Sequence, residues 1–295
     1  MILMPDPAAE MKGAEIMLEL WYSVVDFLLP FDWTKYNFMK NALLAVLLLT
    51  PLFGLLGTMV VSNRMAFFSD SIGHGAFTGI AIGALFGGLQ PLVGAVLFSA
   101  VFAVVITIIK NKSKESTDTI IGVFSSTAVA LGLILLSSGG FNKYSTYLVG
   151  DLLSISPVEL ILLFVSFILV IVLWLFIFNK VLLISINQSL AASRGINTLL
   201  VDIFFTIAIA VIVTITIQWV GLLIINSLIV LPAAASRNVT RNMRQYHAVS
   251  IGISMFSGIS GLIASYYLDT ATGATIVLIA AVIFFATFFI RKRFA

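Results

Sequence analysis

An aspartate and a histidine stand near the start of a long apolar run. Asp70 and His74 are four residues apart, so on a helix their side chains stack on one face. A carboxylate and an imidazole together suit a divalent ion of the zinc or manganese type, and ionisable groups at membrane depth usually mark an ion path. The pair is therefore a candidate metal site.

The spacing of this pair also fits a purely structural role. Asp70 would lie in the first turn of a helix that begins near Ser69, where a carboxylate complements the helix dipole. His74 would then be a buried neutral histidine bonded to a carbonyl group. Both interpretations stay open on the residues alone.

A ridge of glycines runs along the same segment, beside the face of the Asp70–His74 pair. Gly75, Gly79, Gly83 and Gly87 recur every fourth residue. Such a ridge lets a second backbone approach closely, as it does between packed membrane helices. We therefore expect a neighbouring helix to pack tightly against this one.

The composition places the whole chain in a membrane. Of its 295 residues, 60% are hydrophobic and only 10% are charged, with a net charge of +3, which no soluble globular domain matches. The apolar runs are continuous and not alternating, so the predicted fold is an all-α, polytopic transmembrane bundle and not a barrel. Nucleic acid is not an expected partner, because the cations are confined to short loops. The chain has no cysteine, which leaves only nitrogen and oxygen donors for a metal.

Nine apolar runs follow a less regular N-terminal segment. Residues 1–40 are expected to form an extracytoplasmic or interfacial amphipathic segment, and residues 41–295 the transmembrane domain. In the first segment, four acidic residues interrupt the apolar ones, and three aromatic side chains could anchor it at the membrane surface; a true span is the alternative. These residues are Glu15, Glu19, Asp26 and Asp32, with Trp21, Trp33 and Tyr36. The nine runs are 41–62, 70–88, 91–110, 119–138, 157–178, 200–217, 219–235, 247–266 and 272–290.

The lysines and arginines predict the orientation. Of the 16 in the chain, 12 follow the odd-numbered runs or the last run, and 4 fall on the other side. The positive-inside rule then puts the C-terminus in the cytoplasm and the N-terminus outside. The larger group is Arg64, Lys110, Lys112, Lys114, Lys180, Arg194, Arg237, Arg241, Arg244, Arg291, Lys292 and Arg293.

Three further features lie on or near the predicted cytoplasmic side. Residues 187–197 are too polar to span and predict a short helix, capped by Asn187 and ended by Gly195, which is either a docking site or a simple connector. Asn226 and Ser227, in the seventh run, fit a close helix interface or a pore lining. His247 is expected to be interfacial and not a metal ligand.

Signatures of catalysis are absent from the sequence. There is no phosphate-binding G-x-x-x-x-G-K-[ST] loop and no H-E-x-x-H pair, and no nucleophile–base arrangement is legible. We therefore do not expect this chain to be an enzyme or to hold a permanent cofactor.

Eight short stretches carry a resemblance to a known family: 64–74, 122–126, 147–156, 190–197, 220–223, 232–234, 265–269 and 272–276. In this order they resemble the membrane permease subunit of bacterial ABC importers for zinc and manganese, relatives of the vitamin B12 and iron-siderophore permeases. The resemblance covers about residues 37–293. Each matching stretch is weak alone, and their common order makes the signal strong.

The resemblance implies a type II ABC importer that works as a homodimer in the bacterial cytoplasmic membrane. Two copies of a separate ATPase would use ATP on the cytoplasmic side, and an extracytoplasmic binding protein would deliver zinc, manganese or iron. Asp70 and His74 match the family residues that line the metal path at the dimer axis. The helix at 188–196 matches the coupling helix in the ATPase cleft, and its expected contact residues are Gln188, Ser189, Leu190, Ala191, Arg194 and Gly195.

Two positions depart from the family pattern. Gly73 stands where serine is common, and Thr78 where proline is common. Neither change removes a ligand, although the helix geometry around His74 is open to difference. The rival function from the residues is a stand-alone metal or proton-coupled channel or carrier, and a membrane-embedded enzyme has little support.

Overall fold

The computed structural model describes residues 7–85, 90–137 and 146–291, and the secondary-structure elements of these residues are all helices. The longer helices are α1 (Pro7–Leu28), α2 (Asn37–Ser62), α3 (Phe68–Leu85), α4 (Pro91–Lys112), α5 (Thr117–Leu136), α8 (Pro157–Ile186), α10 (Thr198–Val220), α11 (Leu222–Val239), α12 (Met243–Leu268) and α13 (Thr272–Arg291). The short elements are η1 (Asp32–Lys35), α7 (Thr146–Val149), η2 (Leu152–Ser154) and α9 (Gln188–Ser193).

Eight of the nine predicted apolar runs each fall on a single helix, apart from residue 137, which follows α5, and residues 86–88 and 138, which lie outside the described part. The seventh run, 219–235, begins at the end of α10 and continues after Gly221 as α11. Within that part, seven helices are long and apolar enough to cross a membrane. They are α2, α4, α5, α8, α10, α12 and α13. The two remaining runs correspond to α3, which has 18 residues, and to α11.

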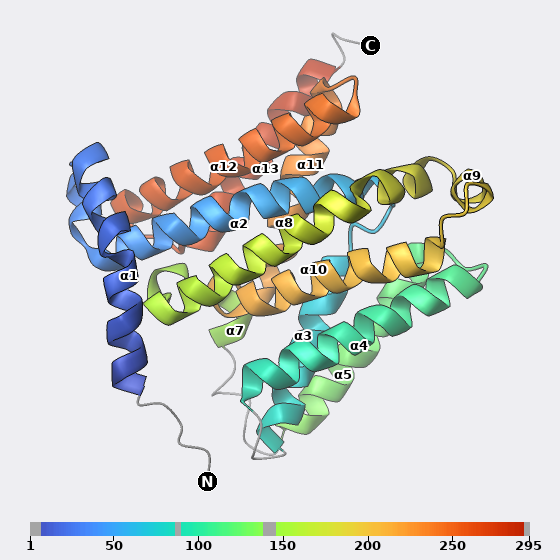
Figure 1. The fold of residues 1–295 in the computed structure, drawn as a ribbon, viewed down its shortest axis with the longest axis horizontal. Helices are drawn as coiled ribbons and strands as arrows, with labels where there is room; N and C mark the ends of the chain where they lie inside the picture. Colours follow the sequence, from blue (N-terminus) through green and yellow to red (C-terminus); the bar gives the residue numbers. More distant parts are fainter. Residues whose placement is uncertain (1–6, 86–89, 138–145, 292–295) are drawn as a thin grey trace.

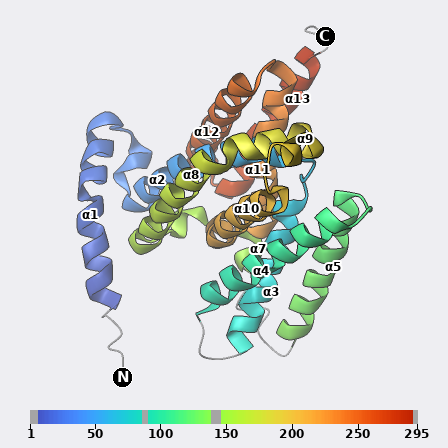
Figure 2. The ribbon, with the colours of Figure 1, turned by 45° about the vertical axis from the view of Figure 1, so that its right-hand side comes forward.

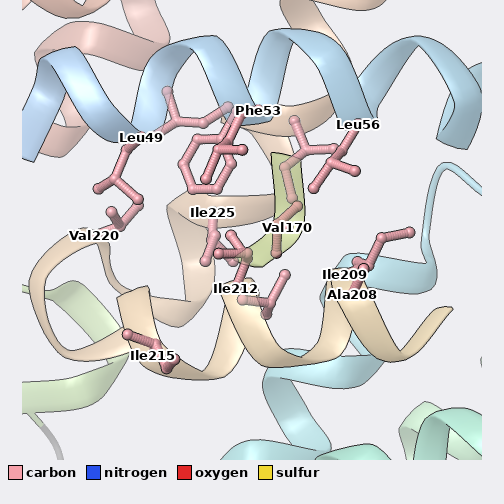
Figure 3. Close-up of a cluster of buried hydrophobic side chains, with 14 of the residues drawn as sticks. Leu49, Phe53, Leu56, Val170, Ala208, Ile209, Ile212, Ile215, Val220 and Ile225 are labelled. Atoms are coloured by element: carbon pink, nitrogen blue, oxygen red, sulfur yellow. The ribbon is translucent and has the colours of Figure 1, made fainter. Parts of the chain in front are cut away.

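Two helices form the centre of the bundle. In α2 and α10, 72% of the 18-residue apolar stretch that could cross the membrane is buried, against 22% in α5 and 11% in α13. The buried cluster of Figure 3 shows why: apolar side chains from α2 and α10 meet between the two helices, with further contributions from α8 and α11. Helices at the periphery expose apolar side chains because lipid, and not water, surrounds them.

Six of the other helices gather in two groups on either side of this centre (Figures 1 and 2). The helices α3, α4 and α5 pack on one another, and α11, α12 and α13 pack together with α2. Contacts of α10 with α3 and α4, and of α11 with α3, join the groups. The candidate metal pair on α3 thus lies in the smaller group, close to its junction with the larger one.

The N-terminal helix α1 runs at a steep angle to α2 and α8, across the end of the bundle opposite α9 (Figure 1). An ion pair of 2.7 Å between Lys40 Nζ and Asp26 fastens it, and Trp21 Nε1 donates to the carbonyl oxygen of Lys40 at 3.0 Å. Of the three expected aromatic anchors, Tyr36 is exposed, Trp21 is half-buried and Trp33 is only 3% exposed. The prediction that Trp33 lies at the lipid interface is therefore wrong, because its ring packs into the protein.

Candidate functional site

Asp70 and His74 lie on one face of the first half of α3, as their spacing predicts. Asp70 Oδ2 and His74 Nε2 are 3.7 Å apart, and both side chains are half-buried, with 35% and 24% of their surfaces exposed. Within the described residues, no group of three or more His, Cys, Asp or Glu side chains could hold a metal. One copy of the chain therefore brings two candidate ligands together and leaves them partly accessible.

Contacts on both sides of this face fix the rotation of α3. Ser69 Oγ, which is fully buried, donates a hydrogen bond to Asn226 Oδ1 on α11. Thr78 Oγ1 donates to the carbonyl oxygen of Ala128 on α5 at 2.6 Å. Since Asp70 and His74 project between these two directions on the helix, α11 and α5 flank the face that carries the pair.

The glycine ridge packs against α4, which confirms the expected close approach. A Cβ atom added at Gly79 would lie 2.7 Å from the carbonyl oxygen of Gly94 and 2.8 Å from Ala95 Cα. One added at Gly75 would lie 2.8 Å from the ring of Phe102. Only glycine allows two helix backbones this close. Gly87 lies outside the described residues.

The structure also gives the surroundings of Asn226 and His247. Asn226 accepts the hydrogen bond from Ser69, so this residue of the seventh run contributes to a helix interface between α3 and α11. His247 packs against the aromatic rings of Phe178 and Trp174 on α8, and its two ring nitrogens are buried with no hydrogen-bond partner in the described chain. The expectation that His247 is interfacial is corrected, because its nitrogens face the protein.

The two departures from the family pattern have different local surroundings. At Gly73, an added Cβ would meet Leu222 Cγ at 3.4 Å, an ordinary contact, so a serine would fit there. At position 78, the threonine hydroxyl makes the bond to α5 that a proline would lack. The substitution at 78 therefore replaces backbone stiffness with a side-chain link between α3 and α5.

The short helix α9 forms where residues 187–197 predicted it. The Asn187 side chain accepts a hydrogen bond from the backbone N–H of Leu190 at 2.9 Å, and Gly195 takes a left-handed φ of 76° after the helix ends. Ala191 is fully buried against the bundle. The other expected contact residues are exposed at this end of the molecule: Gln188, Ser189, Leu190, Arg194 and Gly195.

A polar network, which the sequence reasoning missed, links α9 to α4 and α10. Gln188 Nε2 donates to Asn111 Oδ1 at 3.0 Å, and Asn111 Nδ2 donates to Asp202 Oδ2 at 3.2 Å. The same oxygen of Asp202 lies 3.3 Å from Lys110 Nζ, and both of these side chains are largely buried. The sequence does indicate part of this network, because Asp202 is an acidic residue within the sixth apolar run, and an acidic residue at such a position needs a buried partner.

Known proteins with related sequences and structures cover nearly the whole chain. A family model described as the ABC 3 transport family matches residues 35–291. The high-affinity zinc uptake system membrane protein ZnuB of Haemophilus influenzae is 31% identical, over 88% of this chain and 99% of its own length. The manganese transport system membrane protein MntC of Listeria monocytogenes is 28% identical, over 88% of this chain and 92% of its own length.

A solved structure with the same fold is PsaBC from Streptococcus pneumoniae in complex with a Fab. It superposes with a TM-score of 0.76 at 25% sequence identity, over 93% of this chain and 96% of that one. A putative metal-chelate type ABC transporter in an inward-facing conformation superposes with a TM-score of 0.62 at 16% identity, over 96% and 99% of the two chains. The second likeness bears on the fold alone.

Proposed function

This chain belongs to the ABC 3 transport family, and on that premise we propose that it is the permease subunit of an importer for a divalent metal ion. The transported ion is zinc or manganese, with iron as a third candidate, and a separate ATPase supplies the energy. The relatives in a zinc uptake system and a manganese transport system support this class of cargo. Carboxylate and imidazole ligands do not by themselves distinguish among these metals.

The observation that carries the proposal is the accessible, incomplete pair on α3. A two-fold axis beside this face would bring together two copies of Asp70 and His74, giving two carboxylates and two imidazoles. Four such ligands can replace the hydration shell that a divalent ion loses at membrane depth. Binding there need not be tight, because an ion path must release the ion as well as accept it.

The path in this proposal crosses a bundle of nine spans of the vitamin B12 permease type, with α3 and α11 as the two short ones. Short spans suffice where neighbouring helices shield them from lipid. The C-terminus and α9 lie in the cytoplasm, the N-terminus outside, and α1 rests on the outer membrane surface. The distribution of lysine and arginine supports this orientation.

The exposed surface of α9 is the proposed contact with the ATPase, and the polar network that begins at Gln188 is the proposed link to the metal path. A displacement of Gln188 acts through Asn111 on α4 and, through Asp202, on α10. Helix α4 in turn packs on the glycine ridge of α3. A movement of α9 caused by ATP binding to the partner can therefore be transmitted to the Asp70–His74 pair through packed helices.

The test is metal uptake by cells that carry the complete transporter, with an extracytoplasmic binding protein supplied. Asp70→Ala and His74→Ala should each reduce uptake of zinc or manganese by at least about tenfold, since even indirect damage to a metal site costs that much. The ATPase should still co-purify with both variants. Asp118→Ala, which removes an exposed carboxylate from the first turn of α5, is the matched control and should transport normally.

Normal uptake by both α3 variants would exclude this role for the pair. Uptake that continues when the ATPase is deleted would instead favour a stand-alone carrier. Comparing zinc, manganese and iron in the same assay identifies the cargo.

A further inference from the structure

A basic cavity lies where α11 ends, α12 begins and α13 ends. Its volume is about 490 Å³. Three arginines line it, Arg237 from α11, Arg241 from the turn before α12, and Arg291 from the last turn of α13. The other lining residues are Asn238, Val239, Thr240 and Gln245. Guanidinium groups from three different segments thus converge on one space.

No acidic side chain lines this cavity, and none of the ion pairs within the described residues involves its three arginines. The polar neighbours are partly engaged elsewhere. Thr240 Oγ1 donates to the carbonyl oxygen of Ser236, and Asn238 Nδ2 donates to Thr287 Oγ1. Three like charges in one cavity repel one another, so the arrangement favours an anion with several oxygen acceptors, which guanidinium groups bind best.

The surface beside the cavity, along α13, is apolar and exposed. Only 11% of the apolar stretch of α13 that could cross the membrane is buried. Phe289 and Ile290, directly before Arg291, are 70% and 44% exposed, and the same helix exposes Leu278, Val282 and Phe285. An acyl chain can therefore lie along α13 while the polar group at its end reaches the arginines.

We propose that this cavity binds the phosphate of an anionic phospholipid headgroup, with the lipid chains against α13. The site is separate from the Asp70–His74 pair and from α9, and it does not depend on the transported ion. A cationic cavity between membrane helices is a recognised form of lipid-headgroup site. A bound lipid would tie the end of α13 to the α11–α12 turn.

The test is lipid titration of the purified full-length chain in detergent, followed by native mass spectrometry and thermal unfolding. Phosphatidylglycerol should be retained and should raise the unfolding temperature saturably, whereas phosphatidylcholine should not. The double variant Arg237→Gln/Arg241→Gln should weaken phosphatidylglycerol binding by about thirtyfold, because each cation near an anionic lipid contributes on the order of 1 kcal/mol.

A matched double variant, Lys112→Gln/Lys114→Gln, also removes two exposed cations from the α9 end of the bundle and should weaken binding by less than about threefold. Equal weakening in both doubles would overturn the proposal in favour of diffuse attraction. Inorganic phosphate that stabilises the wild-type chain as well as the lipid does would overturn it in favour of a soluble anion. If the arginine double does not fold, Arg237→Lys keeps the charge but loses the planar fork. That variant should weaken lipid retention, and unchanged retention would contradict the proposal.

Discussion

At the scale of single residues, the Asp70–His74 pair combines two properties that are rarely found together inside a membrane protein. Each side chain is ionisable, and each keeps about a quarter to a third of its surface exposed. A carboxylate with a purely structural role in the membrane interior is expected to be buried against a cation, as Asp202 is against Lys110. The contrast between these two aspartates favours a binding role for Asp70 and a structural role for Asp202.

Gly79 gives a prediction about packing that is independent of transport. Gly79→Ala should lower the free energy of unfolding by about 1–3 kcal/mol, because the new Cβ would overlap backbone atoms of Gly94 and Ala95 on α4. Gly122→Ala on α5 is the matched control. No atom lies within 4 Å of its added Cβ, so the helix should gain roughly 0.5–1 kcal/mol. Thermal unfolding in detergent measures both, and the same sign at the two positions would contradict the close helix contact.

At the scale of elements, α9 is held to the bundle in two ways. Ala191 packs into the bundle, and Gln188 joins a hydrogen-bonded chain that ends at a buried ion pair. These hydrogen bonds give α9 a direct side-chain connection to α4, in addition to the backbone that joins α9 to α8 and α10. This arrangement is what a coupling helix requires.

Asn111 is the connecting member of that chain, and its loss should uncouple transport. In the assembled transporter, Asn111→Ala should reduce the metal moved per ATP hydrolysed by about two- to thirtyfold, the range of measured coupling energies along such links. ATPase binding should persist, since Asn111 lies behind α9. Glu115→Ala, at an exposed position in the turn between α4 and α5, should leave the ratio unchanged. An unaltered ratio in the Asn111 variant would remove the network from the coupling route.

At the scale of the whole molecule, the proposed site is complete only when two copies meet. The described part of one chain offers two ligands at the pair and no third acidic, histidine or cysteine side chain nearby. The exposed apolar helices, α5 and α13 above all, face lipid or another subunit. The position of the two-fold axis decides which of these helices faces lipid and which faces the second subunit.

Because the chain has no cysteine, this axis can be located with single introduced thiols. His74→Cys should give a cross-linked dimer with a short bis-maleimide in membranes, because the two copies of this face are expected to meet. Leu278→Cys, on the exposed side of α13, should not. Cross-linking at position 278 with none at 74 would place the axis elsewhere and leave the metal site incomplete.

Apolar run length and the spacing of a few polar residues determined much of this protein in advance. Within the described residues, the helices of the apolar runs, the stacking of Asp70 on His74, the close approach of a neighbouring helix along the glycines and the caps of α9 all follow from local periodicity and short-range hydrogen bonding. Each depends on residues within a few positions of one another, and a single sequence contains that information.

Tertiary structure alone decided which partners meet across long stretches of chain. It paired Ser69 with Asn226, placed Trp33 and the nitrogens of His247 inside the protein, joined Gln188 to Asp202 through Asn111, and brought Arg237 and Arg291 to one cavity. In a membrane every helix is apolar on most of its surface, so hydrophobic periodicity does not say which face meets which neighbour. That choice depends on side-chain fit between segments tens to hundreds of residues apart.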